Sequence, residues 1–81
     1  MFYSDVDPVA TGNSIKVLCY KCGLSASDLR RELGLESVQA VYKWYSGKCI
    51  PSIDKLFAME KLFSVSIHEI VVFYQNRQEV I

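Results

Sequence analysis

The chain has 81 residues, of which 51% are hydrophobic, and its formal net charge is zero. This length and hydrophobic content suit one small domain with a single core. No apolar run reaches the roughly 18 residues of a membrane span, no secretory signal is present, and one histidine without a paired nucleophile excludes the usual enzymes. We therefore expect a cytoplasmic, non-enzymatic protein.

The first ten residues are expected to form an N-terminal arm. Phe2, Tyr3 and Val6 can form a short strand that Pro8 ends. A first helix is then expected to open at residues 12–14 and to end at a glycine. Its buried stripe follows the i, i+3, i+4, i+7 pattern of an amphipathic helix and comprises Ile15, Leu18, Cys19 and Cys22.

The cysteines raise the question of a metal. Cys19 and Cys22 form a C-x-x-C pair, to which Cys49 and His68 could add two zinc ligands. However, Cys49 and His68 lie in distant segments, and the C-x-x-C pair shares a predicted helix face with apolar residues. We therefore expect packed thiols in a reducing compartment, with no metal and no cofactor.

Two short helices joined by a tight turn are predicted in the middle of the chain. Ser25 and Asp28 form a capping-box pattern at the start of the first of these helices. Its inward residues are Ala26, Leu29 and Leu33, and Gly34 makes the turn. The second helix is expected over 37–45, with Val41 and Trp44 inward. A tight pair of this kind is typical of the helix-turn-helix motif, which inserts its second helix into the DNA major groove.

Two further helices are expected after Pro51. Ser52 caps the first, whose broad apolar face comprises Ile53, Leu56, Phe57, Met59 and Phe63. Ser66 and Glu69 form a second capping box, and Ile67, Ile70 and Val71 bury that helix. The β-branched and aromatic residues 71–74 favour an edge strand.

From Ile15 to Val72 the chain resembles the Cro/cI-like helix-turn-helix family of bacterial and phage repressors. The residues that carry the resemblance include Leu33-Gly34, Val41-Tyr42-Lys43-Trp44, Ser46-Gly47-Lys48 and Pro51-Ser52-Ile53. The resemblance implies an all-α, five-helix, lambda-repressor-like domain over 11–74 that binds operator DNA, usually as a dimer. Residues 75–81 are then a C-terminal tail.

The chain departs from the family pattern in three places. The stretch from Gly34 to Gly47 is one residue longer than usual. The family's Arg–Glu pair between the first and third helices is replaced by Cys19 and Tyr45, which we predict pack together. Glu60 and Ser64 replace a usual small residue and a usual glycine.

Candidate DNA contacts follow from the motif. The outward residues of the third helix are the candidate base contacts: Ser37, Val38, Gln39, Tyr42 and Lys43. Candidate phosphate contacts at helix starts and turns are Asn13, Ser14, Lys16, Ser25, Ala26, Ser46, Gly47 and Lys48. Gln39 can pair with adenine. Ser37 can equally cap the helix, Val38 can fold into the core, and Lys43 can be solvated.

The charge pattern supports this interpretation only in part. Residues 16–48 carry six basic and three acidic side chains, which gives +3 where the motif lies, whereas the flanks are acidic. One copy alone should therefore bind DNA weakly, and we expect a homodimer formed through the fifth helix and Phe73-Tyr74. The alternative is a helix-turn-helix fold used for protein contacts, as in an anti-repressor or antitoxin partner.

Overall fold

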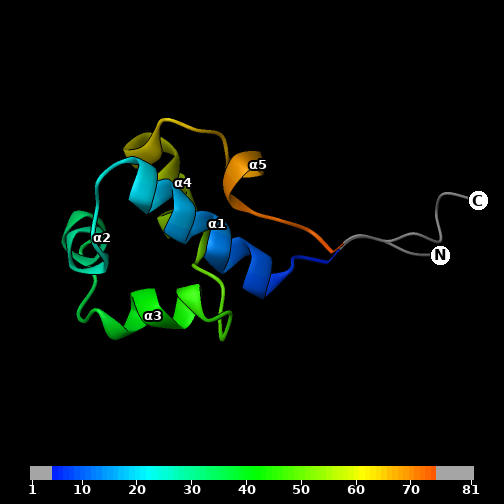
Figure 1. Ribbon diagram of the computed structural model, residues 1–81, viewed down its shortest axis with the longest axis horizontal. Coiled ribbons are helices and arrows are strands. Elements are labelled where there is room, and N and C mark those ends of the chain that lie inside the picture. Colours follow the sequence, from blue (N-terminus) through cyan, green and yellow to red (C-terminus); the bar gives the residue numbers. More distant parts are fainter. Residues whose placement is uncertain (1–4, 75–81) are drawn as a thin grey trace, which may run out of the picture.

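The computed structural model describes residues 5–74. This part of the chain contains five helices and no strand (Figure 1). The helices are α1 (Pro8–Lys21), α2 (Ala26–Leu33), α3 (Gln39–Tyr45), α4 (Ile53–Phe63) and α5 (Ile67–Ile70). The expected all-α architecture with five helices is confirmed. The contacts are most numerous between α1 and α3, so the first helix is the main support of the third.

α1 begins earlier than the sequence suggested. Asp7 is its N-cap and accepts a hydrogen bond from the Ala10 amide at 3.1 Å, while Pro8 occupies the first helical turn. Proline is well suited to that position because its missing N–H has no partner there and its φ is already helical. The expected opening at residues 12–14 is therefore wrong. Pro8 begins a helix rather than ending a strand.

Gly12 consequently lies inside α1, where it is buried. A Cβ atom at this position would overlap the carbonyl oxygen of Trp44 at the end of α3. The absence of a side chain thus allows the backbones of α1 and α3 to approach closely. This contact sets how far α3 stands out from the domain.

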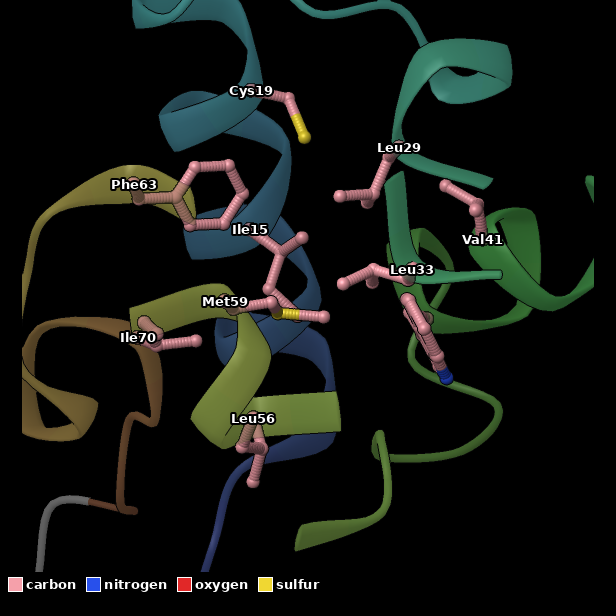
Figure 2. Close-up of a cluster of buried hydrophobic side chains, with 10 residues drawn as sticks. Ile15, Cys19, Leu29, Leu33, Val41, Leu56, Met59, Phe63 and Ile70 are labelled. Carbon is pink, nitrogen blue, oxygen red and sulfur yellow. The ribbon is translucent and has the colours of Figure 1, made fainter. Parts of the chain in front are cut away.

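The core gathers one or more side chains from every helix (Figure 2). Its buried hydrophobic members are Ile15, Cys19, Leu29, Leu33, Val41, Trp44, Leu56, Met59, Phe63 and Ile70. The predicted inward positions of α2 and α3 are confirmed, because Ala26 also packs against this cluster. The stripes of α1 and α4 are narrower than expected. On α1, Ile15 and Cys19 are buried and Leu18 packs against them, whereas Cys22 is the C-cap residue and is exposed.

On α4, Ile53 and Phe57 are 62% and 54% exposed. Leu56, Met59 and Phe63 follow i, i+3, i+7 spacing and fill the side that faces the core. Ile53 and Phe57 lie one turn apart on an adjacent side of the helix. The expected broad apolar face of α4 is therefore only partly buried.

The segments before α1 and after α5 are joined side by side. The amide of Asp7 donates to the carbonyl of Val72 at 2.7 Å, and that of Tyr74 donates to Asp5 at 2.9 Å. Val6 and Phe73 form a single antiparallel bridge instead of the edge strand expected over 71–74. The proposed pairing of Phe2 and Tyr3, and the C-terminal tail 75–81, lie outside the described residues.

The two unusual residues near α5 have structural roles. Ser64 ends α4 with a φ of 57°, the left-handed backbone for which glycine is the common choice. The Glu60 carboxylate accepts the Ile67 amide at 2.7 Å and so satisfies a free N–H at the start of α5. The predicted capping box of Ser66 and Glu69 is also present.

Candidate nucleic-acid interface

Two basic side chains hold the turn between α2 and α3 by donating hydrogen bonds to its backbone carbonyls. Gly34 ends α2 in the left-handed conformation, with a φ of 67°. Arg30 donates to the carbonyl of Leu35 at 3.1 Å, and Lys55 of α4 donates to that of Leu33 at 3.2 Å. These two cations are therefore used to fix the turn. No local pattern could assign this role to Lys55, because it lies 22 residues downstream of Leu33.

α3 presents a polar face outward and an apolar face inward. Val41 is fully buried and Trp44 is 5% exposed, so both anchor the helix from behind, as predicted. Gln39, Tyr42 and Lys43 are exposed on the other side. Together with Ser46 and Lys48 they line a hollow of about 310 Å³, which we call the α3 surface. The ammonium groups of Lys43 and Lys48 and the side-chain amide of Gln39 therefore belong to one concave patch. All five residues of this patch lie close together in sequence.

Ser37 and Val38 precede α3, which begins two residues later than expected. The Ser37 hydroxyl accepts a hydrogen bond from the Gln39 amide at 3.3 Å, although the N-cap position of α3 is Val38. Val38 is half-buried and packs against the core. For Val38 this contact favours packing into the core over a DNA contact, and for Ser37 the hydrogen bond favours a role at the start of α3.

The turn after α3 differs from the expected phosphate grip. The amides of Ser46, Gly47 and Lys48 already donate to carbonyls of Tyr42, Trp44 and Lys43, at 2.9–3.0 Å. The Ser46 hydroxyl donates to the Lys43 carbonyl as well. The phosphate contact expected of the Ser46 and Gly47 amides stays a prediction, and these hydrogen bonds within the protein do not favour it. Those donors close the end of α3, and the exposed ammonium of Lys48 is the cation that this turn presents.

Two features of the structure favour glycine at position 47. Its φ is 81°, and a Cβ atom there would approach the side chain and backbone of Val9 in α1 to less than 3 Å. The turn after α3 is thus packed directly against the first turn of α1. This contact positions Lys48 relative to the rest of the domain.

The N-terminus of α2 already carries a carboxylate. Ser25 and Asp28 form the predicted capping box, with hydrogen bonds of 2.9 and 3.0 Å. The Ser25 amide, and after it the Arg31 guanidinium at 2.8 Å, hold the pKa of Asp28 below its usual value. A phosphate near Ser25 and Ala26 would meet this negative charge, partly balanced by Arg31. The helix start is a weaker phosphate site than the sequence suggested.

The three candidates on α1 lie on two sides of that helix. The Ser14 hydroxyl donates to the Glu69 carbonyl at 3.0 Å and so ties α1 to α5. Asn13 and Lys16 line a separate cleft beside Ala26 and Tyr45. Ser14 is therefore separated from this pair, and it is engaged within the protein.

Cys19 and Tyr45 pack together, as predicted from the missing ion pair. Burial, followed by the neighbouring Cys19 thiol, raises the pKa of Tyr45. Burial also raises the pKa of the Cys19 thiol. Both groups are thus held neutral, which spares the domain the cost of a buried charge. Lys16 adds its ammonium 5.9 Å from the centre of the Tyr45 ring.

The geometry of α2 and α3 agrees with a comparison of the whole sequence. A family model described as helix-turn-helix matches residues 15–70, which is more than half of the chain. The chain belongs to the helix-turn-helix family of the Cro/cI type. As a member of this family it is a DNA-binding, non-enzymatic domain.

The fold of this helix-turn-helix protein is similar to that of a solved bacterial protein. A transcriptional regulator from Listeria innocua superposes with a TM-score of 0.71 at 23% sequence identity. The match covers 93% of the present chain and 64% of the other, so our chain spans less than two thirds of that regulator. No curated protein matches the sequence. Among the described residues no helix is both long and apolar enough to cross a membrane.

Proposed function

We propose that this helix-turn-helix protein is a sequence-specific transcriptional repressor that inserts α3 into the major groove of operator DNA. The observation that carries the proposal is the α3 surface, where Gln39, Tyr42 and Lys43 face outward while Val41 and Trp44 anchor the helix. A rigid helix with a polar outer face is what major-groove recognition requires. The resemblance to Cro/cI repressors favours repression over activation.

Each exposed residue of the α3 surface has a distinct task in this proposal. Gln39, at the first turn of α3, pairs through its amide with an adenine. Tyr42 and Lys43, one turn further on, reach neighbouring bases. Lys48 lies at the other end of the surface and binds a backbone phosphate, which fixes the register without reading sequence.

The proposed assembly is a homodimer. Two exposed lysines on the α3 surface give one copy little electrostatic affinity, so two linked half-sites are needed for firm binding. The fifth helix and the adjoining Phe73 and Tyr74 are the proposed contact, since these two side chains are 45% and 51% exposed. A two-fold arrangement places successive half-sites about 34 Å apart along the DNA.

Selection of duplexes from a random pool tests function and assembly together. We expect the purified full chain to enrich a two-fold symmetric consensus, and the enriched duplex, placed over a promoter, to allow repression in transcription in vitro. A selection that ends in no consensus would contradict sequence-specific recognition. An asymmetric single half-site would contradict the dimer alone.

Replacing Gln39 by Ala should alter which sequence is preferred. Loss of a bidentate amide–adenine pair removes about 1–3 kcal/mol of discrimination at one base pair. The measurement is a set of binding constants for the selected duplex and its single-base variants. If Gln39→Ala left both affinity and preference unchanged, Gln39 would not be a base contact.

Replacing Lys48 by Gln should weaken binding to all duplexes alike. Removal of one phosphate contact lowers the slope of log affinity against log salt by about 1. Lys61→Gln is the control, because Lys61 is exposed on α4 and lies outside the α3 surface. An equal change in slope for both variants would show a general charge effect rather than a contact of Lys48.

The second candidate function is a protein-interaction module, such as an anti-repressor or antitoxin partner. The exposed apolar residues Ile53, Phe57 and Phe73 and the zero net charge favour it. The two candidates differ in salt dependence, because only binding to DNA releases many condensed counterions.

A further inference from the structure

A cleft of about 510 Å³ lies beside the DNA-binding elements and is not explained by the proposed function. One wall is a stripe along α1 formed by Asn13, Lys16, Val17 and Tyr20. The opposite wall comes from Leu24, ahead of α2, and from Tyr45 at the end of α3. Three separate segments therefore converge on it.

The lining of this cleft combines apolar surface with one positive charge. Val17 is 42% exposed and Tyr20 is 86% exposed, so both side chains offer apolar surface that a ligand could cover. Lys16 is the single charged residue among those that line the cleft. The two ion pairs within residues 5–74 involve other groups, Arg31 with Asp28 and Lys55 with Asp54.

The position of the Lys16 ammonium determines which kind of ligand the cleft can bind. The Lys16 ammonium lies over the Tyr45 ring, at the edge of the apolar walls, with the Asn13 amide one turn away. An anionic head group would meet a cation and an amide donor there. A flat ring on the same molecule would lie against Val17, Tyr20 and Leu24. A cationic ligand would meet Lys16 and be repelled.

We propose that this cleft binds a small molecule that joins an aromatic ring to a carboxylate or similar anion. Its volume falls within the range of about 300–1,000 Å³ that is typical of small-ligand sites. Mostly apolar walls with a few polar groups that fix orientation are the usual composition of such sites. The chemistry of Lys16 and Asn13 supplies the orienting groups.

If the protein binds DNA as proposed above, a ligand in this cleft should also affect that binding. Lys16 and Ala26 line the cleft and are also candidate phosphate contacts. A bound anion neutralises Lys16 and places a negative charge beside the first turn of α2. It should therefore lower the affinity of the protein for DNA.

The test uses two ligands that share one ring system and differ in charge. The full chain, labelled with ¹⁵N, is titrated without DNA with naphthalene-1-acetate and with 1-naphthylmethylamine. We expect amide shifts concentrated at the cleft residues and a Kd for the acetate below about 1 mM. The amine should bind at least about tenfold more weakly. Lys16→Gln should weaken binding of the acetate about tenfold, and Lys61→Gln should leave it unchanged.

Four results would overturn the proposal: shifts absent from the cleft at millimolar acetate, equal binding of acetate and amine, full affinity in Lys16→Gln, or loss of the acetate alone in Tyr20→Ala. Because these titrations contain no DNA, they fail or succeed independently of the proposed function. The dispersion of amide signals in the ¹⁵N spectrum of each variant shows whether it is folded. A Tyr20→Ala variant, altered at a largely exposed wall residue, separates the contribution of ring contact from that of charge. It should weaken the acetate and the amine in parallel, since it removes ring contact and no charge.

Discussion

Gly12→Ala should destabilise the domain by roughly 3 kcal/mol or more, at the upper end of the range for overpacked sites. The added methyl group would overlap the carbonyl oxygen of Trp44, which belongs to the backbone of α3 and cannot move aside by a rotamer change. Relief requires α1 and α3 to separate. For a domain of this size the melting temperature should fall by about 12–24 °C.

Asn13→Ala is the matched control, since Asn13 is the next residue of α1 and its side chain is exposed. It should change stability by no more than about 0.5 kcal/mol. Thermal unfolding followed by circular dichroism compares the two variants. A Gly12→Ala protein that melts within 2–3 °C of wild type, a shift of roughly 0.5 kcal/mol, would show that the two helices are not as closely packed as described.

Trp44→Ala should cost roughly 3–5 kcal/mol, enough to unfold most domains of this size. The indole is 5% exposed and belongs to the core cluster with Val41. Its removal leaves a cavity behind the helix that carries the α3 surface, and the neighbouring helices cannot fully close it. Urea unfolding measures the loss of stability.

Tyr20→Ala is the aromatic comparison for this variant, because Tyr20 is 86% exposed. It should alter the free energy of unfolding by no more than about 0.5 kcal/mol. Similar losses for the two variants would contradict the assignment of Trp44 as the anchor of α3.

Local patterns in the sequence predicted the elements whose stabilising contacts are local. The capping boxes at Ser25 and Ser66 depend on residues three positions apart, and both are present. Val41 and Trp44 were recognised as inward because they lie at i, i+3 on one helix face. The pairing of Cys19 with Tyr45 followed from two family positions that change together.

The errors arose where distant contacts decide the outcome. Pro8 in the sequence suggests the end of a strand, but Asp7 caps a helix there, and its amide donates to the carbonyl of Val72, 65 residues away in the chain. Ile53 and Phe57 are apolar by composition, yet the position of α4 against α2 and α5 leaves them outside the core. Periodicity alone cannot tell which apolar residues of a helix find a partner.

The sequence predicts which residues belong to the α3 surface, but not which of their polar groups are free to contact DNA. Gln39, Tyr42, Lys43, Ser46 and Lys48 do line one hollow. The amides of the turn after α3 and the hydroxyl of Ser14 were expected to face a phosphate, and each has a partner within the protein. These hydrogen-bond partners depend on how segments distant in sequence pack together. The spacing of residues along the chain does not reveal that packing.

The central claim is that the outward face of α3 meets DNA, and the most direct test is the binding of random-sequence duplex at several salt concentrations. Fluorescence anisotropy with the full chain should show affinity that falls steeply with salt. On random sequence, the cations of each copy that can reach phosphates are Lys43 and Lys48 on the α3 surface and Lys16 on α1. Together they predict a slope of about −2 to −3 in log affinity against log salt. A slope near zero, or no binding even at the lowest ionic strength, would contradict the account.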